Sequence, residues 1–155
     1  MIKTIASVGL PVDETLMIKK RRIEPKEHRK GLKRISVVTG IHGDELEGQY
    51  VCYELSRRIE QDFDSLKGIV DIYPAMNPLG IDSITRGIPA FDLDMNRLFP
   101  GNIDGNMTEY LAAEIIKDVS DFLRTQKKCD IVIASSHSSV DQMVPDELTK
   151  VSSVS

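Results

Sequence analysis

The sequence has few of the features that define several large classes of protein. Its 155 residues include two cysteines, three histidines and no tryptophan. Cys52 and Cys129 lie far apart and form no Cys-x-x-Cys pair, which favours two reduced, partly buried thiols in a cytosolic protein over a disulfide framework. No apolar run approaches the length of a membrane-spanning helix. These absences predict a globular protein without a membrane segment.

The charge balance argues against a nucleic-acid or membrane-surface protein. The 20 basic and 24 acidic side chains give a net charge of −4, so no general electrostatic attraction to polyanions is expected. One basic cluster, residues 19–22, is followed by further basic residues up to Arg34. Acidic residues interrupt it and no aromatic residues interleave with it, which predicts a solvated face or a hairpin. No signal-peptide pattern precedes the first apolar segment, so a cytoplasmic location is expected.

The order of the predicted elements indicates an α/β fold. Alternating residues predict an N-terminal hairpin around Pro11, and three apolar runs predict core strands. Helical spacing predicts two long helices, the first with Tyr50 and Val51 on its apolar face and the second capped by Thr108. Strands that alternate with long helices favour a largely parallel sheet. The predicted elements cover, in chain order, residues 3–9, 14–22, 35–41, 44–62, 69–74, 108–123 and 131–134.

The segment His42-Gly43-Asp44-Glu45 places two metal-ligating side chains three residues apart at a predicted strand-to-helix junction. A histidine at the end of the strand and a glutamate in the first helical turn can converge on one point. An imidazole nitrogen and a carboxylate oxygen are common zinc ligands, and a third ligand and a water would complete a catalytic site. An alternative is that Asp44 and Glu45 favour the helix N-terminus while His42 is an ordinary loop residue.

A long irregular segment follows the strand predicted at residues 69–74. Such loops are uncommon in compact domains and are more often functional than accidental. This one carries Arg86 and Arg97, whose guanidinium groups suit a carboxylate or a developing oxyanion, with the amide of Asn96 beside them. In the alternative interpretation Arg97 pairs with a nearby aspartate, Asp92 or Asp94, and only braces the loop.

Four motifs occur in order between residues 40 and 101. They are Gly40-Ile41-His42-Gly43-Asp44-Glu45, Asn77-Pro78-Leu79-Gly80, Arg86-Gly87 and Asp94-Met95-Asn96-Arg97-Leu98-Phe99-Pro100-Gly101. Together they resemble the succinylglutamate desuccinylase/aspartoacylase family of the zinc carboxypeptidase superfamily. The resemblance implies a zinc-dependent hydrolase of an N-acyl amino acid or a similar small carboxylate, on a three-layer α/β/α fold with a mixed, mostly parallel sheet. Residues 1–140 would form an incomplete domain of this kind, and residues 141–155 a polar, frayed tail.

The resemblance also implies a zinc site with one ion per chain. His42 and Glu45 match the first two ligands. His137, which follows the strand predicted at residues 131–134, would supply the third, although two serines precede it where the family has an aspartate and an apolar residue. A surface histidine in a polar loop is the alternative for His137. His28 lies in a charged N-terminal stretch and is a poor rival.

For the substrate, the resemblance implies one catalytic and two binding residues. Arg86 would polarise the scissile carbonyl, and Asn96 and Arg97 would hold the carboxylate of a small anionic substrate. Asp94 would brace that pair. The family's general-base glutamate lies beyond the part that matches, and no family motif surrounds Glu147.

The sequence therefore supports several functional hypotheses. The first is a zinc-dependent amidohydrolase. The second is a catalytically inert module that keeps the metal and carboxylate site, motivated by the absent base motif. A peptidase that removes the C-terminal residue of a peptide is a third, and an α/β interaction domain that uses none of these residues is a fourth. The acyl group, the amino acid and the oligomeric state are left open.

Overall fold

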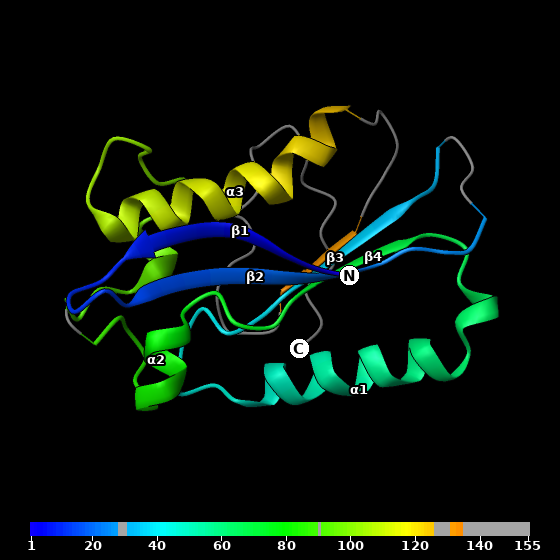
Figure 1. The fold of residues 1–155 in the computed structure, drawn as a ribbon, viewed down its shortest axis with the longest axis horizontal. Coiled ribbons are helices and arrows are strands. Elements are labelled where there is room, and N and C mark those ends of the chain that lie inside the picture. Colours follow the sequence, from blue (N-terminus) through cyan, green and yellow to red (C-terminus); the bar gives the residue numbers. More distant parts are fainter. Residues whose placement is uncertain (28–30, 90, 126–130, 135–155) are drawn as a thin grey trace.

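The computed structural model describes residues 1–27, 31–89, 91–125 and 131–134. Within these ranges the chain forms five strands, three α-helices and two short 3₁₀ helices (Figure 1). The elements are β1 (Ile2–Gly9), β2 (Thr15–Ile23), β3 (Arg34–Val38), α1 (Glu47–Gln61), η1 (Phe63–Ser65), β4 (Ile69–Tyr73), α2 (Pro78–Ser83), η2 (Met95–Arg97), α3 (Met107–Thr125) and β5 (Ile131–Ala134). No helix in this part of the chain is both long and apolar enough to cross a membrane.

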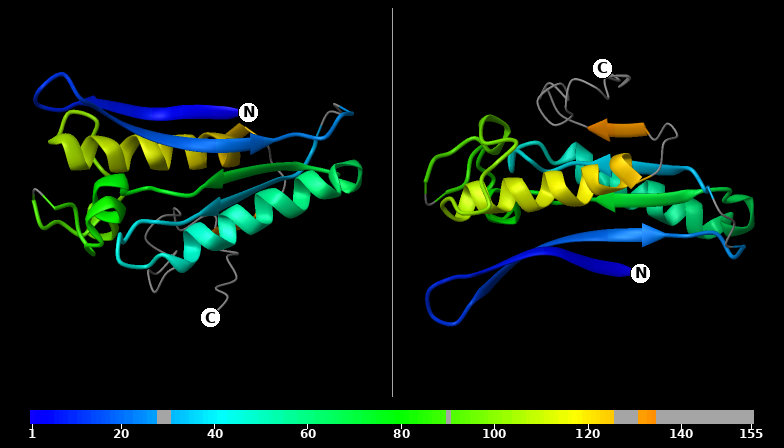
Figure 2. Two further views of the ribbon diagram at one scale, coloured as in Figure 1. Left: turned by 60° about the horizontal axis from the view of Figure 1, so that its bottom comes forward. Right: turned by 90° about the horizontal axis from the view of Figure 1, so that it is seen from above.

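The strands form one mixed sheet in the order β1-β2-β4-β3-β5. Strands β4, β3 and β5 are parallel, whereas β1 pairs antiparallel with β2, and β2 with β4. Figure 2 shows the long β1–β2 hairpin at one edge of the sheet and β5 at the other. The predicted hairpin and the predicted core strands are therefore present, and the antiparallel edge accompanies a parallel centre.

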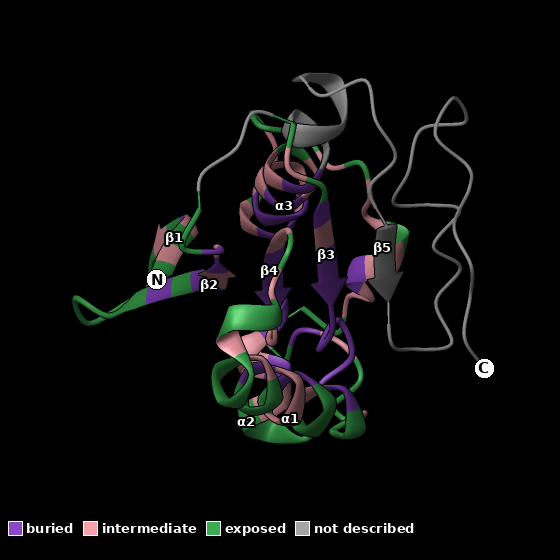
Figure 3. Ribbon diagram, turned by 90° about the vertical axis from the view of Figure 1, so that its right-hand side faces the viewer, coloured by how far each residue is buried: buried purple, intermediate pink, exposed green. Residues whose placement is uncertain are grey.

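Helices cover both faces of the sheet and make three layers. α3 lies on one face and α1 on the other, with the buried strands β3 and β4 between them (Figures 1 and 3). Alternate residues of these strands supply two separate cores, because successive side chains point to opposite faces. Val38 and Tyr73 pack with Ile115 under α3, and Val37 and Ile72 pack on the other face. The α/β/α expectation is confirmed.

Helix α1 begins later than the sequence predicts and exposes part of its expected apolar face. Its first helical residue is Glu47, so Glu45 lies before the helix rather than in its first turn. Tyr50 and Val51 are exposed, whereas Cys52 is buried as a free thiol. Burial raises the pKa of the Cys52 thiol, which keeps it protonated and unreactive.

The N-terminus of helix α3 is capped two residues earlier than predicted. The side-chain oxygen of Asn106 accepts hydrogen bonds from the backbone N–H groups of Thr108 and Glu109 at 3.0 and 3.1 Å. The Glu109 carboxylate accepts in return from the Asn106 backbone N–H at 2.9 Å. This reciprocal pair is a capping box, so Asn106 rather than Thr108 is the N-cap.

A buried ionic cluster, here called the Asp71 cluster, crosses the α3 face of the sheet. The Asp71 carboxylate is fully buried and accepts two hydrogen bonds of 2.7 Å from Arg22. Arg34 pairs with the same carboxylate, and Lys20 Nζ lies 3.3 Å from it and 2.5 Å from Asp118 on α3. The basic residues 19–22 lie in β2 of the predicted hairpin, so that alternative is confirmed. The alternative of a solvated face is wrong for Lys20 and Arg34, which are 4% and 3% exposed.

The charges around Asp71 decide its protonation state. Burial opposes ionisation, but the hydrogen bonds from Arg22 and the charges of Arg34 and Lys20 outweigh it, so the pKa of the Asp71 carboxyl lies below its ordinary value. In an unfolded chain this pKa is about 3.9. The ionised carboxylate therefore stabilises the fold above that pH, and its contribution is lost as the pH falls through the lower pKa of the folded state.

We expect Asp71→Asn to lower the free energy of unfolding by about 3–5 kcal/mol at neutral pH, because it leaves buried cations without their counter-charge. Urea denaturation followed by circular dichroism measures the change. The matched control is Asp64→Asn, since Asp64 pairs with Lys26 at 2.6 Å but is 81% exposed, and it should change stability little. Equal urea midpoints for Asp71→Asn and the wild type would contradict a stabilising cluster.

Candidate metal centre

The candidate site lies where the parallel strands β3 and β4 end. His42 follows β3 and Asn77 follows β4, and the two segments are joined by a hydrogen bond of 2.7 Å from the Asn77 backbone N–H to the Gly40 carbonyl. Gly40 has a φ of 70°, and a Cβ there would meet the Pro74 carbonyl oxygen at 2.8 Å. Carboxyl ends of parallel strands are the common location for binding sites in such sheets.

The backbone of the His42 loop packs directly against the start of α2. A Cβ on Gly43 would lie 1.9 Å from the Gly80 carbonyl carbon, so only glycine fits there. The Gly43 N–H donates to the Thr85 carbonyl at 3.0 Å. The buried side chain of Asn77 accepts from Gly80 N–H at 2.9 Å and donates to the Gly87 carbonyl at 3.1 Å. These contacts fix the segment that carries Arg86 beside His42.

The imidazole of His42 is buried between two carboxylates. Its Nδ1 lies 3.0 Å from Glu45 Oε1, and its Nε2 lies 3.1 Å from Asp94 Oδ1. His42 is 1% exposed, whereas the Glu45 and Asp94 side chains are 27% and 21% exposed. The structure thus brings His42 and Glu45 together as the motif predicts, although through a turn rather than a helix.

Each nitrogen of the ring faces a carboxylate oxygen. Both carboxylates can only accept, so the ring can donate to either of them; in the tautomer that a metal ion at Nδ1 requires, Nε2–H donates to Asp94. Asn96 Nδ2 lies 3.0 Å from the same nitrogen, and the Asn96 backbone N–H donates to Asp94 Oδ1 at 3.0 Å. In the tautomer with the proton on Nε2, Nδ1 presents a lone pair toward Glu45. A carboxylate that fixes the far nitrogen of a histidine is a frequent support for metal ligands.

The His42–Glu45 pair suits a cation. Two acceptors 3.0 Å apart repel each other unless a proton or a metal ion lies between them. Two ligands on one tetrahedral zinc ion stand about 3.3 Å apart, close to this spacing. One imidazole nitrogen and one carboxylate oxygen are also donors that zinc uses. The two side chains therefore fit as part of a zinc site.

A complete ligand set is not found within the described ranges. No group of three or more histidine, cysteine, aspartate or glutamate side chains there is placed to hold one metal ion. His137, the predicted third ligand, lies outside the described residues, as do the rival His28, the tail at 141–155 and Glu147. The third ligand stays a prediction.

Two arginines lie at the rim of this site. Arg86 donates from Nη1 to Glu45 Oε1 at 3.4 Å, and its Nη2 lies 3.8 Å from Asp94 Oδ2. Arg97 Nε also lies 3.8 Å from Asp94 Oδ2, but the Arg97 side chain is 86% exposed. The alternative pairing of Arg97 with Asp94 is thus present as a long contact that leaves the guanidinium in solvent, where it can meet an anion.

Sequence reasoning missed the main contacts of Asp94 and Asn77. Asp94 was expected only to brace Asn96 and Arg97, yet it also holds the ring of His42. The signal for Asn77 was present, because asparagine before Pro78 is typical of an N-cap with proline at the first helical position. The tie from Asn77 to Gly87 depends on tertiary structure and has no local signal.

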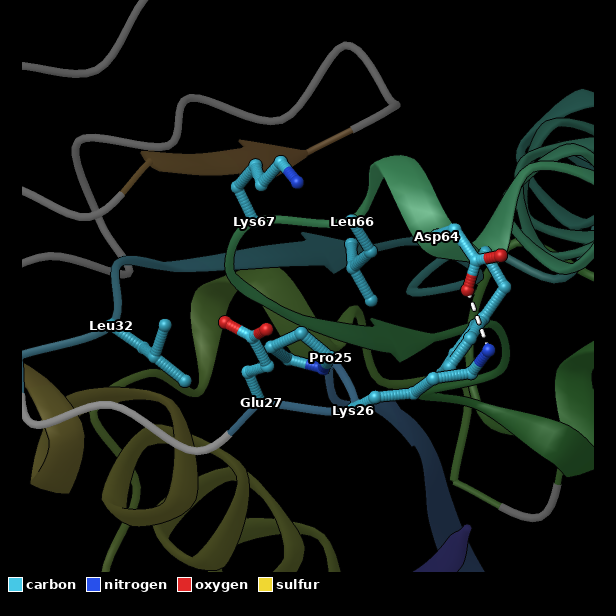
Figure 4. A pocket seen from close by; sticks show the side chains of 8 residues that line it. Pro25, Lys26, Glu27, Leu32, Asp64, Leu66 and Lys67 are labelled. Carbon is cyan, nitrogen blue, oxygen red and sulfur yellow. Dashed lines mark hydrogen bonds and ion pairs between the residues drawn. The ribbon is translucent and has the colours of Figure 1, made fainter.

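A pocket lies at the opposite end of the parallel strands. This pocket of about 460 Å³ is formed by the segments that precede β3 and β4 (Figure 4). Its Lys26 and Asp64 side chains pair with each other at 2.6 Å. The pocket contains none of the predicted site residues, so the His42 region is the stronger candidate.

Comparison with known proteins tests the family resemblance. The profile of the succinylglutamate desuccinylase/aspartoacylase catalytic domain matches residues 31–134, which include His42, Glu45, Arg86, Asp94 and Arg97. The chain belongs to this family. The predicted resemblance is therefore confirmed.

Individual relatives show how much of the family's length is present. N-alpha-acetyl-L-2,4-diaminobutyric acid deacetylase of Halomonas elongata is 38% identical over 73 residues, which are 47% of this chain and 21% of that protein. Crystal structures of a succinylglutamate desuccinylase/aspartoacylase from Rhodobacter sphaeroides and an aspartoacylase family protein from Mesorhizobium loti align with TM-scores of 0.67 and 0.63, at 26% and 25% identity. Each alignment covers 86% of this chain and 39% of the other. The chain thus spans less than half of these relatives.

We expect Gly43→Ala to disrupt the site, because the new methyl group overlaps the Gly80 backbone and neither turn can move without breaking its hydrogen bonds. The free energy of unfolding should fall by at least about 2 kcal/mol in urea denaturation. Gly9→Ala is the matched control, since a Cβ at Gly9 has no atom within 4 Å. Similar stability of the two variants would show that the Gly43–Gly80 contact is not a constraint.

Proposed function

We propose that this chain carries the metal-binding part of a zinc-dependent hydrolase that cleaves the amide bond of an N-acyl amino acid or a similar small carboxylate. The observation that supports the proposal most directly is the 3.0 Å approach of His42 Nδ1 and Glu45 Oε1, with Asp94 on the other ring nitrogen. This arrangement leaves a lone pair and a carboxylate oxygen facing each other, in a chain that belongs to a family of deacylating hydrolases.

The proposed roles follow from what each side chain contacts. His42 and Glu45 would hold the zinc ion, with His137 as the third ligand, while Asp94 keeps the His42 ring in the required tautomer. When bound, zinc polarises the scissile carbonyl and makes a bound water more acidic. The guanidinium of Arg86 would stabilise negative charge on the carbonyl oxygen.

The rim of the site supports a small anionic substrate. The exposed guanidinium of Arg97 would bind a substrate carboxylate and Asn96 would donate a further hydrogen bond, which together orient the substrate. The Halomonas elongata relative is named for an N-acetylated amino acid, which agrees with this substrate class. A general base is not assigned, since none of the predicted motifs supplies one.

A second candidate is an inert module that binds metal or carboxylate without hydrolysis. The observation that favours it is that the motifs matched between residues 40 and 101 supply metal and carboxylate contacts but no general base. Both candidates predict zinc binding, and only the first predicts turnover. A peptidase is distinguished by assays that compare N-acyl amino acids with short peptides.

The metal site predicts one tightly bound zinc ion per chain, measured by chelator competition and metal analysis. His42→Ala should abolish tight binding, because it removes one ligand and leaves Glu45 without a partner at the metal. His137→Ala should weaken binding strongly if His137 is the third ligand. His28→Ala is the control and should bind zinc as the wild type does. A wild type without zinc affinity would reject the metal site.

Hydrolysis of an N-acetyl amino acid should be abolished by EDTA and restored by zinc. Arg97→Ala should raise KM by about tenfold to a hundredfold, the expected loss for a charged hydrogen bond to a substrate carboxylate, with a smaller effect on kcat. Arg57→Ala on α1 is the control, because Arg57 pairs with Glu54 at 2.8 Å on the helix surface. Zinc binding without any cleavage would favour the inert module.

A further inference from the structure

Glu45 shares one oxygen between two partners. Its Oε1 lies 3.0 Å from His42 Nδ1 and accepts a hydrogen bond of 3.4 Å from Arg86 Nη1. The other end of the same guanidinium lies 3.8 Å from Asp94 Oδ2. Arg86 therefore contacts both carboxylates that flank the His42 ring. Its positive charge lies close enough to Glu45 to neutralise that carboxylate.

A metal ion at His42 and Glu45 would use the same carboxylate oxygen. Two cations near one carboxylate oxygen repel each other, so each cation is bound to that oxygen less strongly than it would be alone. Arg86 is 55% exposed and its side chain extends from a surface loop, so it can turn away at small cost, whereas His42 is buried and held. The arginine is thus the partner that moves.

We propose that Arg86 competes with the metal ion for Glu45, so that the guanidinium becomes available for an anionic group only after the metal is bound. This inference rests on the proposed metal site and adds an order of events to it. Without metal, Arg86 neutralises Glu45 and limits the repulsion between its carboxylate and the lone pair of His42. When a metal ion is bound, it neutralises the Glu45 carboxylate. Arg86 is then released toward the rim of the site, where the Arg97 side chain already lies in solvent.

Competition has a measurable consequence for metal affinity. If Arg86 must be displaced from Glu45, removing its charge tightens zinc binding, because the free site loses a stabilising contact and the bound site loses a repulsion. We expect Arg86→Gln to tighten zinc about twofold to fivefold at low ionic strength, since the pair is partly exposed and screened. Arg86→Lys keeps the charge and should bind zinc close to the wild-type affinity.

The test is zinc affinity by chelator competition at fixed pH, for the wild type, Arg86→Gln, Arg86→Lys and Arg97→Gln, each checked for folding by circular dichroism. Arg97→Gln removes the same charge from a residue that lies near Asp94 rather than Glu45, and it should change zinc affinity much less. The gain in Arg86→Gln should shrink at high ionic strength.

Two outcomes would overturn the inference while leaving the metal site intact. One is a wild type that binds zinc tightly together with an Arg86→Gln variant that binds it equally or more weakly. The other is equal tightening in Arg86→Gln and Arg97→Gln, which would indicate a general effect of net charge. A wild type that binds no zinc would instead reject the proposed metal site, and the competition with it.

Discussion

The candidate site depends on one close backbone contact, between Gly43 after β3 and Gly80 at the start of α2. A Cβ on Gly43 has no space, and the Gly43 N–H is already bonded to the Thr85 carbonyl. This contact places the loop that holds His42 against the segment that leads to Arg86. Asn77 adds a second tie, from α2 to Gly87, so Arg86 is anchored on both sides in sequence while its side chain stays free.

Given that anchoring, electrostatics determines what the site can bind. The His42 ring is buried with a carboxylate at each nitrogen, which makes the interior of the site acidic and rich in lone pairs. Arg86 and Arg97 lie outside this layer and are 55% and 86% exposed. Hydrogen-bond acceptors therefore form the interior of the site, and the two guanidinium groups lie between these acceptors and the solvent. Such an order suits a cation within and an anion at the rim.

Local sequence patterns predicted the strands, the two long helices and the approach of His42 to Glu45, because each depends on periodicity or on spacing of a few residues. His42 and Glu45 do lie close together, but the predicted cause, a glutamate in the first helical turn, is wrong. Helix α1 begins only at Glu47, and a turn brings the two side chains together. Burial of Lys20 escaped prediction because it depends on the register that sets Arg22 opposite Asp71, across 49 residues of sequence. The pairing of Asp94 with His42 is equally non-local, at a separation of 52 residues.

The two groups of buried polar residues show why one is structural and the other is a candidate site. Asp71 is fully buried, but Arg22, Arg34 and Lys20 supply cations, so the cluster is neutralised by side chains that the fold itself holds. At His42 the fold instead places a ring nitrogen 3.0 Å from a carboxylate oxygen and leaves the nearby arginine on an exposed loop. A buried arrangement that its own neighbours do not fully compensate costs stability, and it is retained where a ligand supplies the missing charge. The difference in compensation, rather than burial or polarity alone, makes the end of β3 the candidate functional edge of this sheet.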